Sequence, residues 1–125
     1  MQVVDNEGMH VALHGTSTIL NDRTETVAAK LCFGRRAYDI PMSSVKSMIG
    51  HPQGASGAAG VVAAIMAMNH NFLPPTINCD EPDPECDLNY TANAAVRRDV
   101  EVALSNSFGF GGHNVTLAVR RYRES

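Results

Sequence analysis

The C-terminal part of the sequence has large apolar residues at every second position in two separate stretches, and this pattern limits the possible folds more than any other feature. Every second residue is apolar from Val100 to Leu104, and the same spacing returns from Val115 to Val119. A spacing of two between large apolar residues predicts β-strands. The run 105–112 between them is rich in glycine, so we expect an antiparallel hairpin with a candidate functional loop at its tip.

The N-terminal third predicts a strand followed by a helix. Met9–Leu13 is a short apolar run that stops at His14, as a buried strand ending in a loop would. A helix is expected to begin at Asp22, because its spacing to Glu25 resembles a capping box, and to stop at Gly34. His14 is therefore expected at the carboxyl edge of a strand.

The middle of the chain predicts a second strand, a loop, a helix and an irregular connection. Ile40–Met42 is a short strand at best, since its proline cannot donate to a ladder. Residues 43–53 form a loop, and Gly54–Met68 is expected to be a core helix whose small first residues can touch another backbone closely. Prolines between Pro74 and Pro84, set among acidic residues, predict a long irregular crossing at the surface.

Composition and charge narrow the class of protein. At 125 residues the chain fits one domain, 1–125, with one modest core. The hydrophobic share of 44% argues against disorder, and the net charge of -3 argues against a nucleic-acid partner. No apolar stretch is long enough to cross a bilayer, and Met1–Glu7 lacks the basic and apolar parts of a signal peptide. We therefore expect a cytoplasmic protein without a membrane partner.

Three side chains are candidates for chemistry, although each also has a structural interpretation. His14 follows a predicted strand, His51 precedes a predicted helix, and Lys46 lies among serines in the loop between them. A single histidine is more often a structural residue or a cap than a catalyst, and a lysine is often simply solvated. His51 is the stronger histidine candidate, because unpaired N–H groups at a helix start favour negative charge nearby. Glu25 is available as a counter-charge for Lys46.

Four motifs stand in a fixed order along the chain: HGTST, SSVKSMIGHPQGASG, PPTIN and SNSFGFGGHN. Together they resemble the C-terminal part of bacterial β-ketoacyl-acyl-carrier-protein synthases of the chain-elongating type, which are condensing enzymes with a thiolase fold. The resemblance runs from about Val11 to Tyr122, and four ordered motifs at family-like separations make it specific. It implies an α/β fold, namely the C-terminal portion of a thiolase-like fold with a mixed sheet, a buried central helix and a C-terminal β-hairpin.

The resemblance also implies a decarboxylative Claisen condensation in fatty acid or polyketide elongation. In that reaction a cysteine carries the acyl chain, malonyl-acyl-carrier protein loses carbon dioxide, and the resulting carbanion attacks the acyl thioester. By the same resemblance, His14 and His51 act as neutral imidazoles that donate hydrogen bonds to the malonyl thioester oxygen as it becomes an enolate. Lys46, paired with Glu25, supplies positive potential and fixes the geometry of the histidines.

Further positions match the family's substrate contacts. Thr16 and Thr18 match a pair that hydrogen-bonds the pantetheine arm of the acyl carrier protein, which is the partner that the resemblance implies. Phe110 matches a gating aromatic whose backbone N–H joins the oxyanion hole, and Phe108 belongs to the same glycine-rich run, expected to move or to approach the substrate. No cofactor and no metal ion is expected, because the acidic position that helps some members hold a monovalent cation is Gly60 here.

The three cysteines of the sequence lack the surroundings of a nucleophile. Cys32 falls near the end of the first predicted helix, and Cys79 and Cys86 lie in the acidic, proline-rich crossing. None is expected to have the depressed pKa that a thiolate nucleophile needs. Their odd number and their spacing also predict free thiols rather than disulfides or zinc ligands. We therefore expect the nucleophile to come from a missing half, carried by a longer chain or by a partner chain.

Two alternatives stay open at this point. An inactive fragment or structural partner would keep the fold without the chemistry. A metal site formed by His14, His51 and His113 would support hydrolysis instead. The predicted helix 54–68 would expose apolar surface in this chain alone, so association with the missing half or formation of a dimer is expected.

Overall fold

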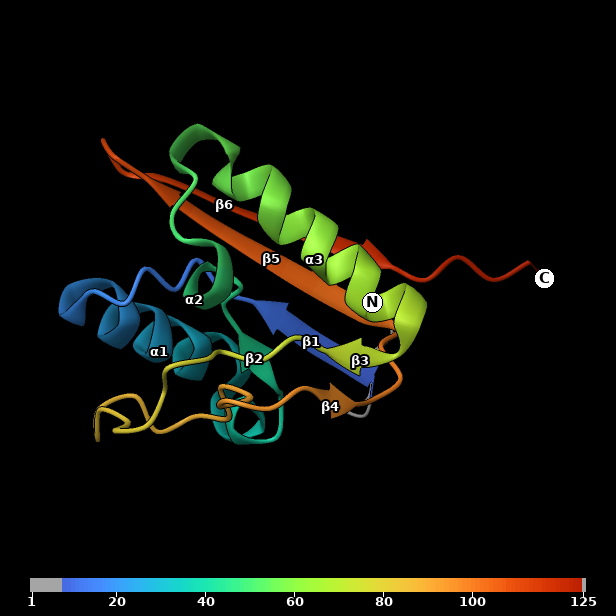
Figure 1. Cartoon of the computed structure of the whole chain (residues 1–125), viewed down its shortest axis with the longest axis horizontal. Coiled ribbons are helices and arrows are strands. Elements are labelled where there is room, and N and C mark those ends of the chain that lie inside the picture. The colour runs from blue at the N-terminus through green and yellow to red at the C-terminus, as the bar shows by residue number, and fades with distance from the viewer. Residues whose placement is uncertain (1–7, 125) are drawn as a thin grey trace.

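The computed structural model describes residues 8–124, which form a mixed four-stranded sheet with helices on both faces. Its strands are β1 (Met9–Ala12), β2 (Met42–Ser43), β5 (Val102–Gly109) and β6 (His113–Arg120), in the spatial order β2-β1-β5-β6. β1 runs parallel to β2 and β5, whereas β6 runs antiparallel to β5 (Figure 1). The predicted mixed sheet and C-terminal hairpin are confirmed. β5 begins at Val102 rather than Val100 and continues to Gly109, so only residues 110–112 of the predicted loop connect the two strands. The prediction that Met1–Glu7 is no signal peptide lies outside the described residues.

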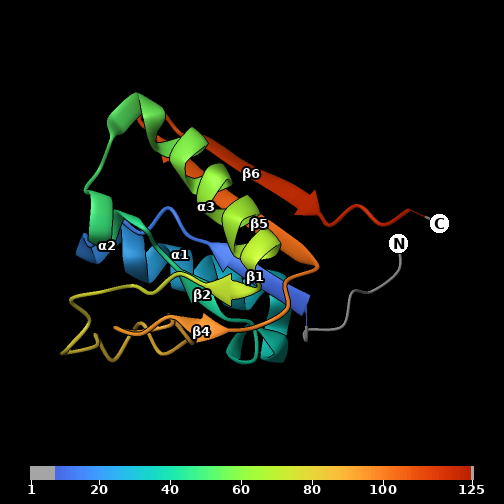
Figure 2. The same cartoon turned by 45° about the vertical axis from the view of Figure 1, so that its right-hand side comes forward.

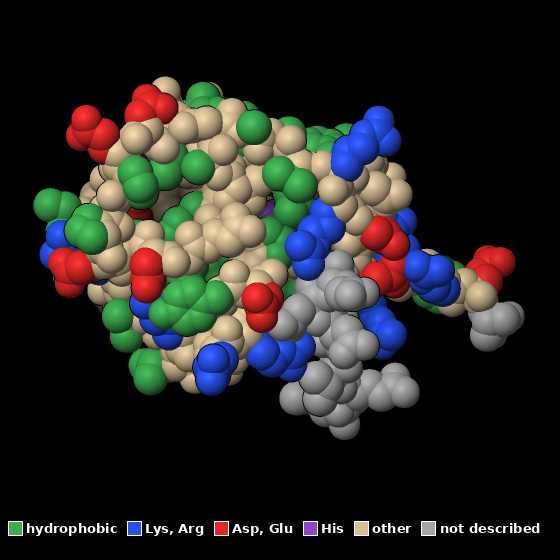
Figure 3. All heavy atoms as spheres, turned by 90° about the horizontal axis from the view of Figure 1, so that it is seen from below, with side chains coloured by type: hydrophobic (Ala, Val, Ile, Leu, Met, Phe, Trp, Pro, Cys, Tyr) green, Lys and Arg blue, Asp and Glu red, His purple; other side chains and the backbone are tan. Residues whose placement is uncertain are grey.

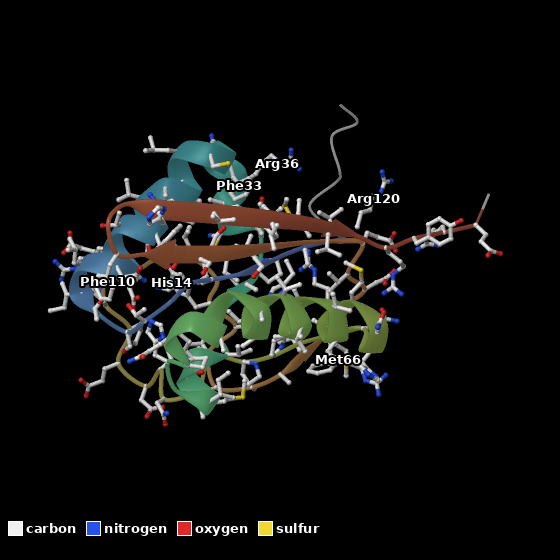
Figure 4. The ribbon with its side chains drawn as sticks, turned by 90° about the horizontal axis from the view of Figure 1, so that it is seen from above. His14, Phe33, Arg36, Met66, Phe110 and Arg120 are labelled. Carbon is white, nitrogen blue, oxygen red and sulfur yellow. The ribbon has the colours of Figure 1, made fainter. Side chains whose placement is uncertain are left out.

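Two long helices lie on opposite sides of this sheet, as Figure 4 shows. They are α1 (Ile19–Phe33) and α3 (Ser56–His70). A 3-10 turn, η2 (Gly34–Tyr38), follows α1. Between β2 and α3 the chain forms α2 (Lys46–Ile49) and a second 3-10 turn, η3 (Gln53–Ala55), so part of the predicted loop is helical. The connection from β2 to α3 therefore holds Lys46 and His51 in ordered turns near the sheet.

Alternation along β1 divides the core into two clusters, one on each face of the sheet. Neighbouring strand residues point to opposite faces, so Val11 and Ala12 belong to different clusters. One cluster packs α1 and η2 against the sheet, and the other packs α3 against it. The buried residues are Val11, Ala29, Ala37, Ile40, Met42 and Leu88 in the first, and Ala12, Ala64, Met68, Leu73, Val100 and Ala103 in the second.

α1 begins earlier than the sequence predicts. Thr18, not Asp22, is the N-cap, because its side-chain oxygen accepts a hydrogen bond from the backbone N–H of Asn21. Asp22 lies in the first turn, where its negative charge suits the helix N-terminus. The predicted stop is confirmed, since Gly34 caps the helix with φ 59°, a conformation that favours glycine.

α3 approaches β5 closely at its glycines, as the small residues of the predicted helix suggest. A Cβ atom built on Gly60 would lie 2.8 Å from Oγ of Ser105, and one built on Gly57 would lie 3.5 Å from Oγ of Ser107. The first distance is shorter than side chains tolerate. Gly60 therefore sets how near α3 can come to the sheet.

Replacing Gly60 by valine is expected to lower the free energy of unfolding by about 1–3 kcal/mol, because the added branches overpack the contact with Ser105. Chemical denaturation of the purified protein measures this. Ala58→Val, at an exposed position of the same helix, is the control for the lower helix propensity of valine and is expected to cost less than about 0.7 kcal/mol. Equal losses in the two variants would contradict the close packing.

The side of α3 that faces away from the sheet is apolar and open. Val62 is 59% exposed, and Ile65 and Met66 are also exposed. The prediction that this helix would expose apolar surface is confirmed. Within the described residues α3 is thus covered on one side only (Figure 2). The prediction that it is a core helix holds for that side alone.

The connection from α3 to β5 is irregular over most of its length, as predicted. Two short strands that the sequence did not indicate, β3 (Phe72–Leu73) and β4 (Val96–Arg97), pair antiparallel at its ends. Ion pairs tie its acidic middle to α1, as in the pair between Arg23 and Asp83 at 3.0 Å and the pair between Lys30 and Asp87. On the face of the molecule in Figure 3, acidic and basic side chains lie next to each other in several places.

His10, in the middle of β1, is fully buried next to β2. Its Nε2 lies 3.0 Å from Oγ of Ser43, and its Nδ1 has no hydrogen-bond partner among the described residues. Burial, with a smaller contribution from the positive charge of Arg98, lowers the pKa of His10 from 6.5 to about 4. The ring is therefore neutral in the folded protein at neutral pH.

Acid is expected to destabilise the protein through His10. Below pH 6.5 the unfolded chain binds a proton at His10, whereas the folded chain, in which the pKa of His10 is about 4, does not. The contribution of His10 to the free energy of unfolding is therefore fully present above pH 6.5 and is lost as the pH falls towards 4. The loss between pH 7 and pH 5 is about 2 kcal/mol. Denaturant unfolding at both pH values, on the wild type and on His10→Gln, isolates this contribution. An equal pH dependence in both proteins would contradict it.

Candidate functional site

The two candidate histidines come from different elements and meet at one end of the sheet. His14 follows the carboxyl end of β1, and His51 lies between α2 and η3. Their ring centroids are 5.6 Å apart, with the planes at 83°, so one ring presents its edge to the other. Figure 4 shows His14 at the end of the sheet that also carries the hairpin tip with Phe110. The expected convergence of these segments is present in the structure.

The His14 ring is buried and neutral. Its pKa lies below the ordinary value, chiefly because burial disfavours the charged form and also because Lys46 and His51 are nearby; Asp22 acts in the opposite direction. Nδ1 is buried without a hydrogen-bond partner among the described residues, so no acceptor is present there for a proton on that atom. A neutral ring is therefore expected to carry its proton on Nε2, where a ligand or water can accept it.

The hydrogen bonds of His51 fix its tautomer. The backbone N–H of Gln53 donates to Nδ1 at 3.0 Å, and Oγ of Ser56 lies 2.9 Å from the same atom. A backbone N–H can only donate, so Nδ1 must present a lone pair. The proton of the neutral ring is then on Nε2. His51 itself is exposed to solvent.

Lys46 touches the site through the backbone of His14. Its Nζ donates to the His14 carbonyl oxygen at 2.6 Å. Partial burial lowers the pKa of Lys46, and the negative charge of Glu25 partly offsets this. The direct pairing with Glu25 that the sequence suggested is absent, since no ion pair within 4 Å joins these two described side chains. Lys46 instead fixes the backbone that carries the imidazole.

Glu25 accepts hydrogen bonds from the backbone of the loop after β1. Its carboxylate, buried on α1, accepts from the backbone N–H groups of His14 at 2.9 Å and Gly15 at 3.0 Å. The side-chain amide of Asn106, on β5, donates to the same carboxylate at 3.0 Å, and its oxygen accepts from Thr116 on β6. Sequence reasoning missed Asn106, because nothing in its local pattern says that it faces α1. These bonds join α1, β5 and β6 to the backbone of His14.

Gly15 permits a close crossing next to His14. It has φ 38°, and a Cβ atom there would lie 2.5 Å from Cβ of Ser44. Oγ of Ser44 donates to the Gly15 carbonyl oxygen at 2.8 Å. Any side chain at position 15 would clash with Ser44 and would strain the backbone, so the loop requires glycine here. Ser44, like Asn106, is a supporting residue that the sequence did not single out.

The two phenylalanines of the hairpin differ in their relation to His14. The Phe108 ring centroid lies 5.4 Å from that of His14, so this aromatic lines the site. The Phe110 side chain is fully exposed at the hairpin tip and has no ring contact in the described part of the chain. The hydroxyl groups of Thr16 and Thr18 lie 2.9 Å apart near the start of α1. Thr18 also caps that helix, so its hydroxyl has a structural role.

The three cysteines are free thiols, and two of them lie beside the supporting residues Gly15, Glu25 and Ser44. Cys32 is exposed near the end of α1. Cys79 and Cys86 line a small apolar cavity of about 90 Å³, and burial raises the pKa of Cys86. An apolar setting disfavours the thiolate form of a cysteine. No disulfide joins the three thiols.

The geometry does not favour the alternative of a metal site. Within residues 8–124, no three His, Cys, Asp or Glu side chains lie close enough together to hold a metal ion, and His113 does not join His14 and His51 in such a group.

None of the helices in the described part of the chain is both long and apolar enough to span a membrane.

Comparison with known proteins gives consistent results. The sequence model described as "Beta-ketoacyl synthase, C-terminal domain" matches residues 3–80. A 3-oxoacyl-[acyl-carrier-protein] synthase 2 of Synechocystis sp. is 54% identical over 91% of the chain, and a tetracenomycin polyketide synthase ketoacyl synthase alpha subunit of Streptomyces glaucescens is 47% identical over 93%. In both cases the chain spans 27% of the relative's length.

The solved structures agree on the fold. In a complex described as a type II polyketide acyl-carrier protein with its ketosynthase bound to the hexaketide, the matching chain superposes on 98% of the present chain with a TM-score of 0.92 and 35% identity. The present chain covers 30% of that chain. The α/β arrangement described above is therefore that of one portion of a ketosynthase, and the thiolase-like fold expected from the sequence is confirmed.

Proposed function

Because the chain belongs to the β-ketoacyl synthase family and forms its C-terminal ketosynthase domain, we propose that it carries the decarboxylating centre of a condensing enzyme in fatty acid or polyketide elongation. The single observation that supports this most strongly is the meeting of two imidazole rings, those of His14 and His51, with their centroids 5.6 Å apart and their planes at 83°. We assign the proton of each ring to Nε2, because Nδ1 of His51 accepts a hydrogen bond from the Gln53 N–H and Nδ1 of His14 faces no acceptor among the described residues. Two such donors suit one anionic oxygen.

The proposed step breaks the bond between the carboxylate carbon and the methylene carbon of a malonyl thioester. Carbon dioxide leaves, and the bonding electron pair moves into the thioester, whose oxygen becomes an enolate. The Nε2–H groups of His14 and His51 donate hydrogen bonds to that oxygen and thereby stabilise the charge as it develops. The enolate carbon then attacks a second, acyl thioester, forming the new carbon–carbon bond and releasing the thiolate that had carried the acyl group.

Lys46 and Glu25 have positioning roles in this proposal. Lys46 adds positive potential beside His14, which favours the neutral ring and the developing anion. Glu25 orients the His14 backbone through two hydrogen bonds. Neither side chain needs to touch the substrate.

The substrate would arrive on the pantetheine arm of an acyl carrier protein. Thr16, Thr18 and Phe108, whose ring centroid lies 5.4 Å from that of His14, are proposed to contact that arm, and Phe110 at the hairpin tip is proposed to act as a gate. The nucleophilic cysteine must come from a segment other than residues 8–124, because the cysteines here lack a suitable setting. That segment, or a dimer partner, would cover the apolar side of α3. We propose residues 1–125 as a partial domain, and a cytoplasmic location stays a prediction.

The proposal is tested by combining the purified chain with a cysteine-bearing N-terminal segment of a related ketosynthase and measuring carbon dioxide release from malonyl-acyl-carrier protein. Release is expected from the mixture and not from either component alone. A mixture that forms a complex but releases no carbon dioxide above background would contradict the proposal. It would support the alternative of an inactive structural partner.

A further inference from the structure

A serine hydroxyl at the start of α3 forms a hydrogen bond with the candidate histidine His51. Ser56 is the first residue of α3 and is buried, with 6% of its surface exposed. Its Oγ lies 2.9 Å from Nδ1 of His51. The hydroxyl is not used to cap α3, whose N-cap residue Ala55 makes no side-chain capping bond. A buried hydroxyl group needs a partner, and His51 supplies it.

The direction of this hydrogen bond follows from the neighbouring one. A serine hydroxyl can donate or accept, but the backbone N–H of Gln53 also points at Nδ1 and can only donate. Nδ1 therefore presents its lone pair, and the Ser56 hydroxyl must donate as well. Two donors on one ring nitrogen disfavour a proton there and restrict rotation of the ring.

We propose that Ser56 is a positioning residue for decarboxylation, which holds His51 with its proton on Nε2 and its ring plane nearly perpendicular to that of His14. This inference rests on the proposed function, and it assigns a part of the reaction to a side chain outside the imidazole pair. The turn η3 brings the hydroxyl back to the ring five residues along the chain. With Ser56 in place, the second donor to the enolate oxygen is oriented before the substrate binds.

The test compares Ser56→Ala with Ser56→Thr, which keeps a hydroxyl, and with Ser47→Ala. Ser47 is the matched control because its hydroxyl bonds only backbone groups, those of Ser44 and Ile77. Two quantities are measured: the ¹⁵N chemical shift of Nδ1 in His51, which reports hydrogen bonding to its lone pair, and kcat and KM for decarboxylation in the assembled enzyme.

Ser56→Ala removes one of the two hydrogen bonds to Nδ1 of His51, so the ¹⁵N chemical shift of this atom is expected to move towards that of an Nδ1 with fewer hydrogen bonds. The same variant is expected to lower kcat by about 3- to 10-fold, with KM little changed. Ser56→Thr and Ser47→Ala are expected to keep the wild-type shift. If Ser56→Ala does not fold, Ser56→Cys, with a weak donor of similar size, replaces it with the same expected direction.

An unchanged Nδ1 shift or an unchanged kcat in the folded Ser56→Ala protein would overturn the proposal. Failure of the proposed function is seen separately, as absence of decarboxylation by the wild type. In that event the Nδ1 shift still decides whether Ser56 donates to His51.

Discussion

Replacing either His14 or His51 by alanine is expected to slow malonyl decarboxylation at least about a hundredfold, which corresponds to about 3 kcal/mol in the transition state. The reason is that each ring supplies one of two hydrogen bonds to an oxygen that gains its charge during the step. The buried setting of His14 makes such a bond stronger than it would be in water. Carbon dioxide release from malonyl-acyl-carrier protein by the assembled enzyme measures the loss.

Two controls separate this loss from misfolding. His70→Ala replaces an exposed histidine at the end of α3 and is expected to leave the rate unchanged. Transfer of the acyl group to the cysteine involves no malonyl enolate, so it is expected to continue in His51→Ala. A decarboxylation rate within about threefold of the wild type in either histidine variant would rule out that ring as a donor to the enolate.

Replacing Glu25 by alanine is expected to lower the free energy of unfolding by about 3–5 kcal/mol and to abolish decarboxylation. The substitution leaves the N–H groups of His14 and Gly15 and the amide of Asn106 without their acceptor in a buried region. It also removes the negative charge near Lys46. Urea denaturation of the purified protein measures the change in stability.

Two further variants show whether the loss of stability comes from the missing acceptor. They are Glu25→Gln, which keeps one accepting oxygen, and the control Thr24→Ala. The amide of glutamine keeps an accepting oxygen but places N–H groups against backbone donors, so an intermediate loss is expected. Thr24 is exposed on the same helix, and its change to alanine is expected to alter stability by less than about 0.5 kcal/mol. A Glu25→Ala protein less than about 1 kcal/mol weaker than the wild type would show that the buried carboxylate does not hold the loop.

The elements with a strong periodic pattern could be predicted from the sequence. Alternation located β5 and β6, and the apolar run before His14 located β1, because these patterns follow from which side chains face the core. The start of α1 was placed wrongly, since Asp22 and Glu25 have the spacing of a capping box, although Thr18 makes the capping bond and Glu25 turns inward to the backbone of His14. The pairing of β3 with β4 depends on contacts across the chain that no local pattern records.

The candidate site was predictable only in its motif residues. His14, His51 and Lys46 carry recognisable motifs, and the structure brings them together. The supporting residues Asn106 and Ser56 also lie within the quoted motifs, but the sequence gives them no role, because their importance comes from hydrogen bonds to groups on other elements or across a turn. The pairing of Lys46 with the His14 carbonyl, rather than with Glu25, is likewise a result of tertiary packing.

The account depends on two neutral imidazoles that both carry their proton on Nε2. The most direct test is ¹⁵N NMR of the histidine side chains in the labelled protein at neutral pH. The structure predicts that His14 and His51 are both neutral, with Nδ1 unprotonated in each ring and Nε2 protonated. A doubly protonated ring at either position, or a proton on Nδ1 of His51, would contradict the account.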